Sequence, residues 1–245
     1  MKFEFSKHKG LFITGTDTGV GKTLIAGAIA KILRQSGKIV GVFKPVATGC
    51  KKTQQGLVSE DARFLAHCAD NECGLDIINP IKFEKPAAPF ACEKAENRKV
   101  DFVKIAITYN HICSKTDFVI VEGIGGIRVP ITVDIDVLSL AKSFDLPVVI
   151  VARSKLGTIN HTLLTIDAIR RSGLSLAGII INGYDEKTGD LAEKTNAAII
   201  KEIGKVEIIA VVPFDDTTNM GKFVIGQKVT NILQSIDWLK IIERR

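Results

Sequence analysis

Aromatic residues, cysteine pairs and long apolar runs are all scarce in this sequence. Aromatic side chains make up only 6% of the 245 residues, so a core must be built mainly from Ile, Val, Leu and Ala. The five cysteines include no CxxC pair, which argues for free thiols in a reducing compartment. The N-terminal residues lack the pattern of a signal peptide, and no apolar run approaches the ~20 residues that span a bilayer. We therefore expect a soluble, cytoplasmic protein with no membrane partner.

Positive charge is in excess but is not concentrated. The formal net charge is +6, and its densest clusters, Lys51-Lys52 and Arg244-Arg245, are both short. Such a surplus is compatible with nucleic-acid binding, with anionic substrates, or with a solvated surface that has no specific role. Because the basic residues are scattered along the chain, the solvated surface is favoured and no nucleic-acid partner is expected.

Short apolar runs alternate along the chain with longer stretches of helical spacing. The runs of strand length, nearly free of polar residues, are Leu11–Thr14, Ile39–Phe43, Phe118–Val121, Val148–Val151, Gly178–Ile181 and Ile208–Val212. Helical spacing occupies 22–36, 60–69, 101–114, 134–144, 159–172, 190–203 and 228–243. This alternation predicts an α/β fold with a doubly wound, mainly parallel sheet flanked by helices, in a single domain over 1–245. The proline-rich segment 79–97 is expected to be a loop with little regular structure.

The first predicted strand is followed by a glycine-rich loop and then by a helix. The loop reads Gly15-Thr16-Asp17-Thr18-Gly19-Val20-Gly21-Lys22-Thr23. Its glycines let backbone N–H groups surround an anion at the positive end of the helix dipole. Lys22 can reach the outer phosphates of a nucleotide, and the Thr23 hydroxyl can bind Mg²⁺. The usual motif has Gly where this loop has Thr16, so a glycine-rich turn with a chance Gly-Lys-Thr is the alternative; the flanking strand and helix favour a phosphate loop.

Charged residues lie where other predicted strands end, and ligands of parallel sheets bind at that edge. Lys44 follows the second strand and can neutralise a transferring phosphoryl group or a carbamate there; a lysine that simply reaches solvent is the alternative. Glu122 follows the third strand, where it can hold Mg²⁺ or form a salt bridge with a lysine. Asp61 lies in Ser59-Glu60-Asp61-Ala62, the start of a predicted helix, so capping is its simplest role.

Two further strand ends carry candidate binding residues. Lys155-Leu156-Gly157-Thr158 precedes a helix, and a cation beside a helix N-terminus suits an anion such as a carboxylate; plain capping by Thr158 is the alternative. Asn182 ends the fifth strand, and its amide can both donate to and accept from the edge of adenine; an Asn tolerated in a turn is equally compatible. The four histidines lack metal-ligand spacing.

Together these segments resemble the dethiobiotin synthetase family over nearly the whole chain, in the same order and at similar spacing. The most specific matches are Lys44-Pro45-Val46-Ala47-Thr48-Gly49 and Lys155-Leu156-Gly157-Thr158-Ile159-Asn160-His161. The loop 15–23, Val121-Glu122-Gly123 and Asn182 also match. The resemblance implies a P-loop NTPase-like, three-layer α/β/α fold. It further implies a cyclo-ligase of biotin biosynthesis that uses ATP and CO₂ or bicarbonate to convert 7,8-diaminopelargonic acid into dethiobiotin, ADP and phosphate.

The resemblance also implies a role for each matched position. ATP would be bound by Thr18, Gly19, Val20, Gly21, Lys22, Thr23, Asp61, Glu122, Gly123, Ile124, Gly125, Asn182 and Pro213. Mg²⁺ would be held by Thr23, Asp61 and Glu122. The catalytic lysines would be Lys44, which stabilises the carbamate and the phosphoryl group in transfer, and Lys22, which holds the phosphates. The diamine would contact Lys44, Thr48 and the loop Pro80–Pro89, and, across the interface of a homodimer, Lys155, Leu156, Gly157 and Thr158.

The main alternative from another class is a switch ATPase of the septum-site and chromosome-partition type, which binds membrane or DNA partners. Such ATPases carry an additional, earlier lysine in the phosphate loop, and this sequence has Asp17 there. The stretch Val229–Arg245 has the spacing of an amphipathic helix, for which packing on the sheet is favoured over membrane anchoring. An amide ligase of the cobyrinate type is disfavoured because the chain has no room for a glutaminase domain.

Overall fold

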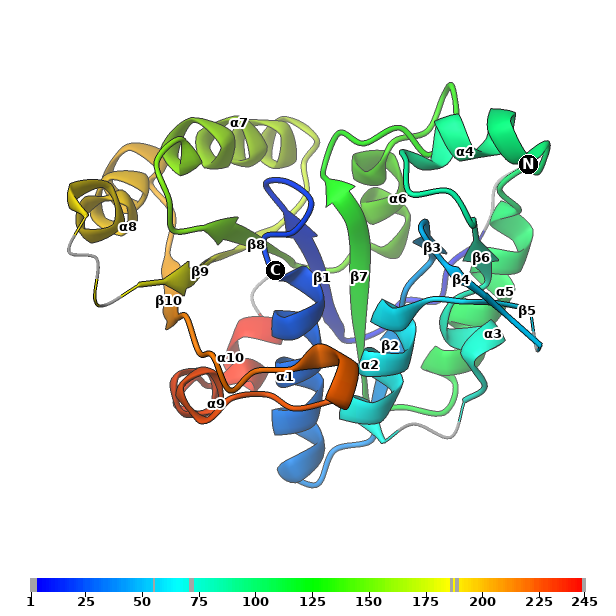
Figure 1. Cartoon of the computed structure of the whole chain (residues 1–245), viewed down its shortest axis with the longest axis horizontal. Helices are drawn as coiled ribbons and strands as arrows, with labels where there is room; N and C mark the ends of the chain where they lie inside the picture. The colour runs from blue at the N-terminus through cyan, green and yellow to red at the C-terminus, as the bar shows by residue number, and fades with distance from the viewer. Residues whose placement is uncertain (1–3, 55, 71–72, 186, 188–189, 244–245) are drawn as a thin grey trace.

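The computed structural model describes residues 4–54, 56–70, 73–185, 187 and 190–243; the basic cluster Arg244-Arg245 lies outside them. Its centre is a six-stranded sheet in the order β10-β9-β8-β1-β7-β2, and all neighbouring strands are parallel (Figure 1). The strands are β1 (Gly10–Gly15), β2 (Val40–Phe43), β7 (Phe118–Gly126), β8 (Val148–Arg153), β9 (Leu176–Tyr184) and β10 (Ile208–Pro213). Every predicted strand is therefore confirmed.

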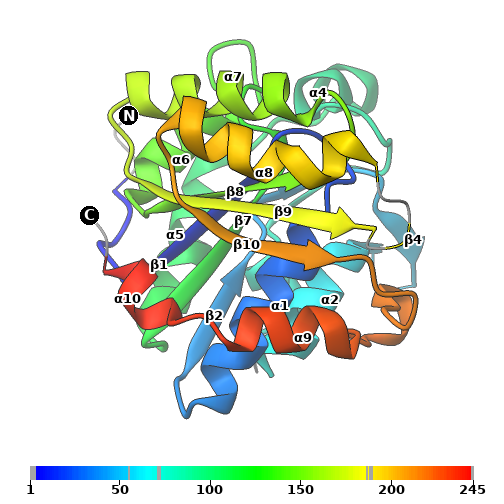
Figure 2. The ribbon, with the colours of Figure 1, turned by 90° about the vertical axis from the view of Figure 1, so that its left-hand side faces the viewer.

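Helices cover both faces of this sheet, as the side view shows (Figure 2). One face carries α5 (Phe102–Cys113), α6 (Val137–Phe144), α7 (Thr158–Arg171) and α8 (Leu191–Gly204); the other carries α1 (Lys22–Gln35), α2 (Glu60–Ala69), α9 (Gln227–Gln234) and α10 (Trp238–Ile242). Successive side chains of a strand point to opposite faces, so Phe12 joins one core while Leu11 and Ile13 join the other. Burial on both faces explains why the strands contain so few polar residues.

The segment 79–97 contains regular structure, so the prediction of an irregular loop is wrong. It includes β6 (Ile81–Lys82), which pairs with β3 (Val46–Ala47), and α4 (Pro89–Glu96), which begins at a proline. Proline is favoured at the first helical position because an N–H there has no partner within the helix. The other short elements are β4 (Lys51–Thr53), β5 (Gly56–Val58), α3 (Leu75–Ile78) and the 3₁₀ helix η1 (Met220–Lys222).

The C-terminal stretch forms two helices rather than the single helix predicted over 228–243. The chain bends between α9 and α10, where Asp237 caps the second helix with its side chain. The indole N–H of Trp238 donates to the Leu233 carbonyl at 2.8 Å and closes the bend. The side chains of Leu233 and Trp238 are buried against the sheet, so this stretch is part of the core. None of the described helices is long and apolar enough to cross a membrane.

Candidate functional site

A pocket of about 610 Å³ opens at the carboxyl edge of the sheet, where the phosphate loop meets the ends of β2 and β7. Most residues that the sequence assigned to the nucleotide, the metal and catalysis line it, together with Thr48, which was assigned to the substrate. The former are Thr18, Gly19, Gly21, Lys22, Thr23, Lys44, Asp61, Glu122, Ile124 and Gly125. The segment Pro86–Pro89 of the expected substrate loop borders the same space. The fold thus gathers at one edge residues that are far apart in the sequence.

The phosphate loop has the backbone shape that anion binding requires. Gly19 and Gly21 have φ values of 75° and 96°, a left-handed conformation that glycine adopts without strain. Gly21 is the N-cap of α1, and no side chain caps this helix, so N–H groups of its first turn remain available to a ligand. A Cβ atom at Gly21 would lie 2.1 Å from Asn182 Nδ2, so any other residue here would displace the Asn182 side chain.

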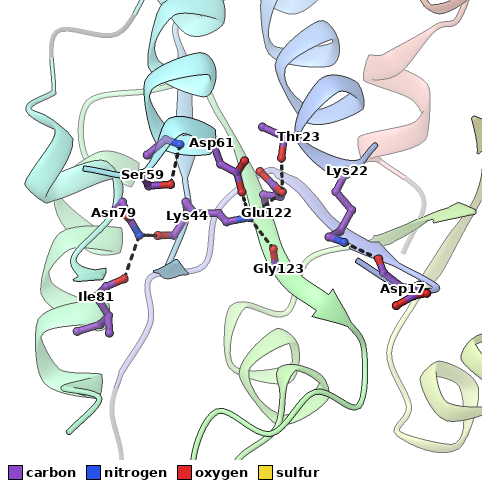
Figure 3. Close-up of polar contacts among 11 residues, drawn as sticks. Asp17, Lys22, Thr23, Lys44, Ser59, Asp61, Asn79, Ile81, Glu122 and Gly123 are labelled. Atoms are coloured by element: carbon purple, nitrogen blue, oxygen red, sulfur yellow. Dashed lines mark hydrogen bonds and ion pairs between the residues drawn. The ribbon is translucent and has the colours of Figure 1, made fainter. Parts of the chain in front are cut away.

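Lys22 is nearly buried at the end of this loop, with 6% exposure. Its ammonium donates to the Asp17 carbonyl at 2.7 Å, which holds the side chain against the loop (Figure 3). Burial lowers the pKa of the Lys22 ammonium to about 8, because the charged form loses hydration that the nearby carboxylates restore only in part. A bound triphosphate would favour the charged form again.

The lowered pKa of Lys22 predicts that ATP binds more weakly at alkaline pH. Only the ammonium form attracts phosphate, and its population in the free protein declines once the pH passes about 8. The dissociation constant of ATP, measured by calorimetry without other substrates, is expected to rise by up to about tenfold per pH unit between roughly pH 8 and pH 10. A dissociation constant that stays level over this range would contradict a role for Lys22 in phosphate binding.

Lys44 follows β2 and lies beside an inner position of the neighbouring strand β7. Because β2 pairs with β7, the residue after β2 lies beside Glu122 of β7. The Lys44 Nζ is 2.7 Å from Glu122 Oε1 and 3.0 Å from Asp61 Oδ2, and it donates to the Gly123 carbonyl at 3.1 Å (Figure 3). The Thr23 hydroxyl donates to the same Glu122 oxygen at 2.8 Å. Two carboxylates, an ammonium and a hydroxyl thus form one connected cluster.

This cluster decides between the alternative roles that the sequence allowed for Asp61 and Glu122. Ser59, not Asp61, caps α2 by accepting from the Ala62 N–H at 3.3 Å, so the Asp61 carboxylate is left to pair with Lys44. The salt bridge offered as the alternative role of Glu122 is present, but it lies within the pocket that the phosphate loop lines. β7 also continues to Gly126, so Glu122 lies inside this strand rather than after it.

Two of the three charges of the cluster are buried, whereas the Asp61 side chain is 43% exposed. Lys44 is 2% exposed and Glu122 is 1% exposed. Burial alone would lower the pKa of the Lys44 ammonium, but the two carboxylates outweigh it and raise that pKa, so Lys44 stays charged at neutral pH. Lys44 in turn lowers the pKa of Asp61. Burial raises the pKa of Glu122, whose Oε2 has no hydrogen-bond partner among the described residues.

The oxygen atoms of Thr23, Asp61 and Glu122 fit a magnesium ion. Mg²⁺ prefers oxygen ligands and is bound by one or two carboxylates together with substrate phosphates and water. Within the described ranges, no three His, Cys, Asp or Glu side chains form a metal site on their own, so phosphates would have to complete the coordination. The buried, unpartnered Oε2 of Glu122 is the feature that favours a cation at this point.

The turn 155–158 lies outside the pocket lining of this chain. Lys155 Nζ is 3.2 Å from Glu193 Oε1, and Leu156 is 83% exposed. Gly157, rather than Thr158, is the N-cap of α7, and the buried Thr158 hydroxyl has no partner among the described residues. Capping by Thr158 is therefore not observed, and the N–H groups at the start of α7 have no side-chain cap.

Asn182 and Pro213 lie towards the carboxyl ends of β9 and β10. The Asn182 side chain donates to the Val20 carbonyl at 3.0 Å, so it supports the loop directly rather than sitting in a turn. Pro213 is the last residue of β10 and lies opposite Tyr184 of β9. Neither residue is among those that line the pocket, so their place beside the base stays a prediction.

Several residues of the site carry no signal that sequence reasoning could have used. Asn79 donates to the Lys44 carbonyl at 2.6 Å and so holds the backbone of that lysine. Met220 reaches the pocket from η1, near the far end of the chain. Asp17, at the position where switch ATPases have a lysine, forms an ion pair with Arg153 of β8. These contacts depend on the tertiary fold and leave no local pattern.

The fold and the phosphate loop define a P-loop nucleotide-binding protein of three-layer α/β/α architecture. A family model described as an AAA domain matches residues 9–220. The septum site-determining protein MinD of Pyrococcus horikoshii, solved with Mg-ADP, has a TM-score of 0.60 over 96% of this chain and 95% of its own, at 15% identity. A putative plasmid partition protein of Borrelia burgdorferi, bound to AMPPNP, has a TM-score of 0.58 at 14% identity, over 96% and 98%. At identities this low, the similarity to these two structures shows a shared fold and nothing about function.

Sequence relatives narrow this class to one family. The chain is 38% identical over 225 residues to the ATP-dependent dethiobiotin synthetase BioD of Thermodesulfovibrio yellowstonii, a match that covers 89% of this chain and 93% of that one. It is 38% identical to the same enzyme of Bacillus subtilis, over 84% and 87%, and 32% identical to that of Clostridium novyi, over 95% and 96%. The chain belongs to the ATP-dependent dethiobiotin synthetase family.

Proposed function

We propose that this chain closes a cyclic urea onto 7,8-diaminopelargonic acid at the expense of ATP. One amine takes up CO₂ and releases a proton, which gives a carbamate. A carbamate oxygen attacks the γ-phosphorus of ATP and ADP leaves, which gives a carbamic-phosphoric anhydride. The second amine then attacks the carbamoyl carbon and expels phosphate, so that the ureido ring of dethiobiotin forms. We assign this reaction to a single domain over 1–245 and to the cytoplasm.

The observation that carries this proposal is the charged, buried Lys44 beside the phosphate loop. In the second step, charge spreads over the phosphoryl group as it passes from ADP to the carbamate. A preorganised cation in a water-poor pocket stabilises such charge, and phosphoryl transfer needs little else besides positioning. A magnesium ion held by Thr23, Asp61 and Glu122 would neutralise further charge on the phosphates.

The other residues of the site bind and orient the nucleotide and the diamine. The loop 18–23 holds the phosphates and residues 122–125 border them, while Asn182 and Pro213, outside the pocket lining, are assigned to the base. Both amines of the diamine are held near the activated carbon, which gives the ring closure a large advantage over a reaction between free molecules. The pocket contains no Ser-His-Asp or Cys-His arrangement in its lining, and this chemistry requires none.

The diamine is expected to bind between two copies of the chain. Thr48 and the segment 86–89 border the pocket on the substrate side, while the turn 155–158 faces a second copy and receives the substrate carboxylate there. The uncapped N-terminus of α7 and the Lys155 ammonium supply the attraction for an anion. The exposure of Leu156 (83%) and Leu164 (61%) supports a protein contact on this side of α7.

An assay of the purified chain with Mg²⁺-ATP, bicarbonate and the diamine tests this function. Phosphate release is expected to depend on the diamine and on bicarbonate, with one dethiobiotin formed per phosphate. Omitting either substrate in turn provides the control. Phosphate release that ignores the diamine, or diamine-dependent release without dethiobiotin, would exclude the proposed reaction.

Glu122→Gln is expected to raise the Mg²⁺ concentration needed for half-maximal turnover by about tenfold or more. The substitution keeps the size of the side chain but removes a charge from the pair of carboxylates that would hold the ion. Glu60→Gln is the matched control, because Glu60 neighbours Asp61 on α2 but pairs with the exposed Lys51. An unchanged Mg²⁺ requirement in Glu122→Gln would count against the metal site.

A further inference from the structure

A buried polar cluster joins α8 to the turn between β8 and α7. The Glu193 carboxylate of α8 is 5% exposed, and its Oε1 lies 2.6 Å from the Ser154 hydroxyl and 3.2 Å from Lys155 Nζ. Asn196, one helical turn further and 2% exposed, donates to the Ser154 carbonyl at 2.7 Å. Side chain and backbone of the turn are thus both fixed by one helix.

Joining α7 to α8 does not by itself explain the buried carboxylate of Glu193. At their other end, α7 and α8 are already joined, since Arg170 donates to the carbonyls of Gly204 and Lys205 at 2.7 and 2.8 Å. A buried carboxylate is a costly way to join helices, because its desolvation outweighs its attraction to a partner unless the geometry is good. Here the carboxylate is directed at Lys155, whose side chain is 56% exposed.

The turn that Glu193 contacts leads into α7 through Gly157. Gly157 is in the left-handed region, with φ of 92°, and a Cβ added there would meet nothing within 4 Å. Steric crowding therefore does not fix this turn, and no side chain caps α7. Besides the backbone bond from the Thr158 N–H to the Lys155 carbonyl at 3.2 Å, the contacts from α8 to Ser154 and Lys155 hold this turn at the start of α7.

We propose that Glu193 is a positioning residue for substrate binding, which acts by holding the Lys155 ammonium in place beside the uncapped N-terminus of α7. This inference rests on the proposed function, in which the turn 155–158 receives the carboxylate of the diamine. Without Glu193, Lys155 would sample many rotamers, and each binding event would have to order it again. Binding of the diamine is affected, whereas the phosphate loop and Lys44 are not.

A comparison of Glu193→Gln with Glu202→Gln tests this role. Both substitutions remove one charge from α8, but Glu202 is exposed. Glu193→Gln is expected to raise the KM for the diamine by about tenfold, with the KM for ATP and kcat changed by less than about twofold. Glu202→Gln is expected to change none of them. Equal changes in both KM values, or no change in the KM for the diamine, would overturn the proposal.

A double-substitution cycle shows whether Glu193 acts through Lys155. Lys155→Met is expected to raise the KM for the diamine, and Glu193→Gln/Lys155→Met is expected to raise it no further, because the interaction to be positioned is already gone. Effects that multiply would mean that Glu193 acts independently and would refute the assignment. If Glu193→Gln does not fold, Glu193→Asp keeps the charge with a shorter reach and is expected to raise the same KM by a smaller factor; an unchanged KM refutes it.

Hydrogen exchange separates failure of this inference from failure of the proposed function. Amides of residues 155–162 are expected to exchange several-fold faster in Glu193→Gln than in the wild type, while those of the phosphate loop stay the same. This measurement needs no substrate. A wild-type chain that makes no dethiobiotin would overturn the function, and unchanged exchange at 155–162 would overturn the positioning role.

Discussion

Lys44→Ala is expected to lower kcat by about 10²–10³-fold and to leave the KM for ATP nearly unchanged. The Lys44 ammonium lies between the carboxylates of Asp61 and Glu122 at the pocket, where it can act on the phosphoryl group in transfer. Loss of an interaction made mainly in the transition state reduces kcat rather than binding. Steady-state kinetics of phosphate release, with dethiobiotin quantified by mass spectrometry, measures both constants.

The same substitution leaves the buried Glu122 without its charge partner, so stability has to be measured alongside. Removing one side of a buried ion pair costs roughly 3–5 kcal/mol. The pKa of Glu122, already raised by burial, then rises further, because the Lys44 charge no longer lowers it. Lys44→Arg keeps the charge and is expected to restore most of the lost stability. Lys104→Ala, at an exposed position on α5, controls for the loss of a lysine.

One result for Lys44→Ala would contradict a catalytic role for Lys44. If Lys44→Ala is folded at the assay temperature, as shown by thermal unfolding, and still turns over within about twofold of the wild-type rate, Lys44 is only a structural partner of the two carboxylates. That result would remove the mechanism proposed for phosphoryl transfer, whatever the family of the chain.

Lys22→Ala is expected to weaken ATP binding by about 10–100-fold and to lower turnover further at subsaturating ATP. The Lys22 ammonium ends the phosphate loop and donates to the Asp17 carbonyl, from where it can reach the β- and γ-phosphates. Calorimetric titration with a non-hydrolysable ATP analogue measures the binding directly. Lys31→Ala removes a lysine from the same helix, outside the pocket lining, and is expected to bind the analogue as the wild type does.

Stability should change in opposite ways for the two lysines. Burial lowers the pKa of Lys22 in the folded chain to about 8, so Lys22 is still mainly charged at neutral pH but its charge costs stability relative to the unfolded chain, and its removal relieves that cost. Lys44 has a raised pKa, so its removal takes away a favourable interaction. Unfolding experiments in which Lys22→Ala is as destabilised as Lys44→Ala would contradict this view of the site.

The strands could be predicted from the sequence because the environment of a buried parallel strand is simple. Leu11–Thr14 and Val148–Val151 lie between helices on both faces, and nearly every position has to be apolar. The C-terminal helices could not be separated in this way. Their apolar residues keep helical spacing across the bend, which is caused by the cap at Asp237 and by the contact of Trp238 with Leu233.

The site could be located from the sequence, but its internal contacts could not. Lys44 follows β2 and Glu122 ends the apolar run of β7, and parallel strands bring such positions to one edge of a sheet. That Lys44 is shared between Glu122 and Asp61 depends on the pairing of β2 with β7 and on the start of α2. Glu193 was missed because nothing near it in the sequence reveals that its carboxylate is buried against the turn after β8.

A crystal structure with Mg²⁺ and a non-hydrolysable ATP analogue tests the central claim most directly. We predict that the terminal phosphate lies within hydrogen-bonding distance of both Lys22 and Lys44, with the ion between that phosphate and the side chains of Thr23, Asp61 and Glu122. A triphosphate bound elsewhere, or one that leaves Lys44 and Glu122 beyond reach of the ion and the terminal phosphate, would contradict the account.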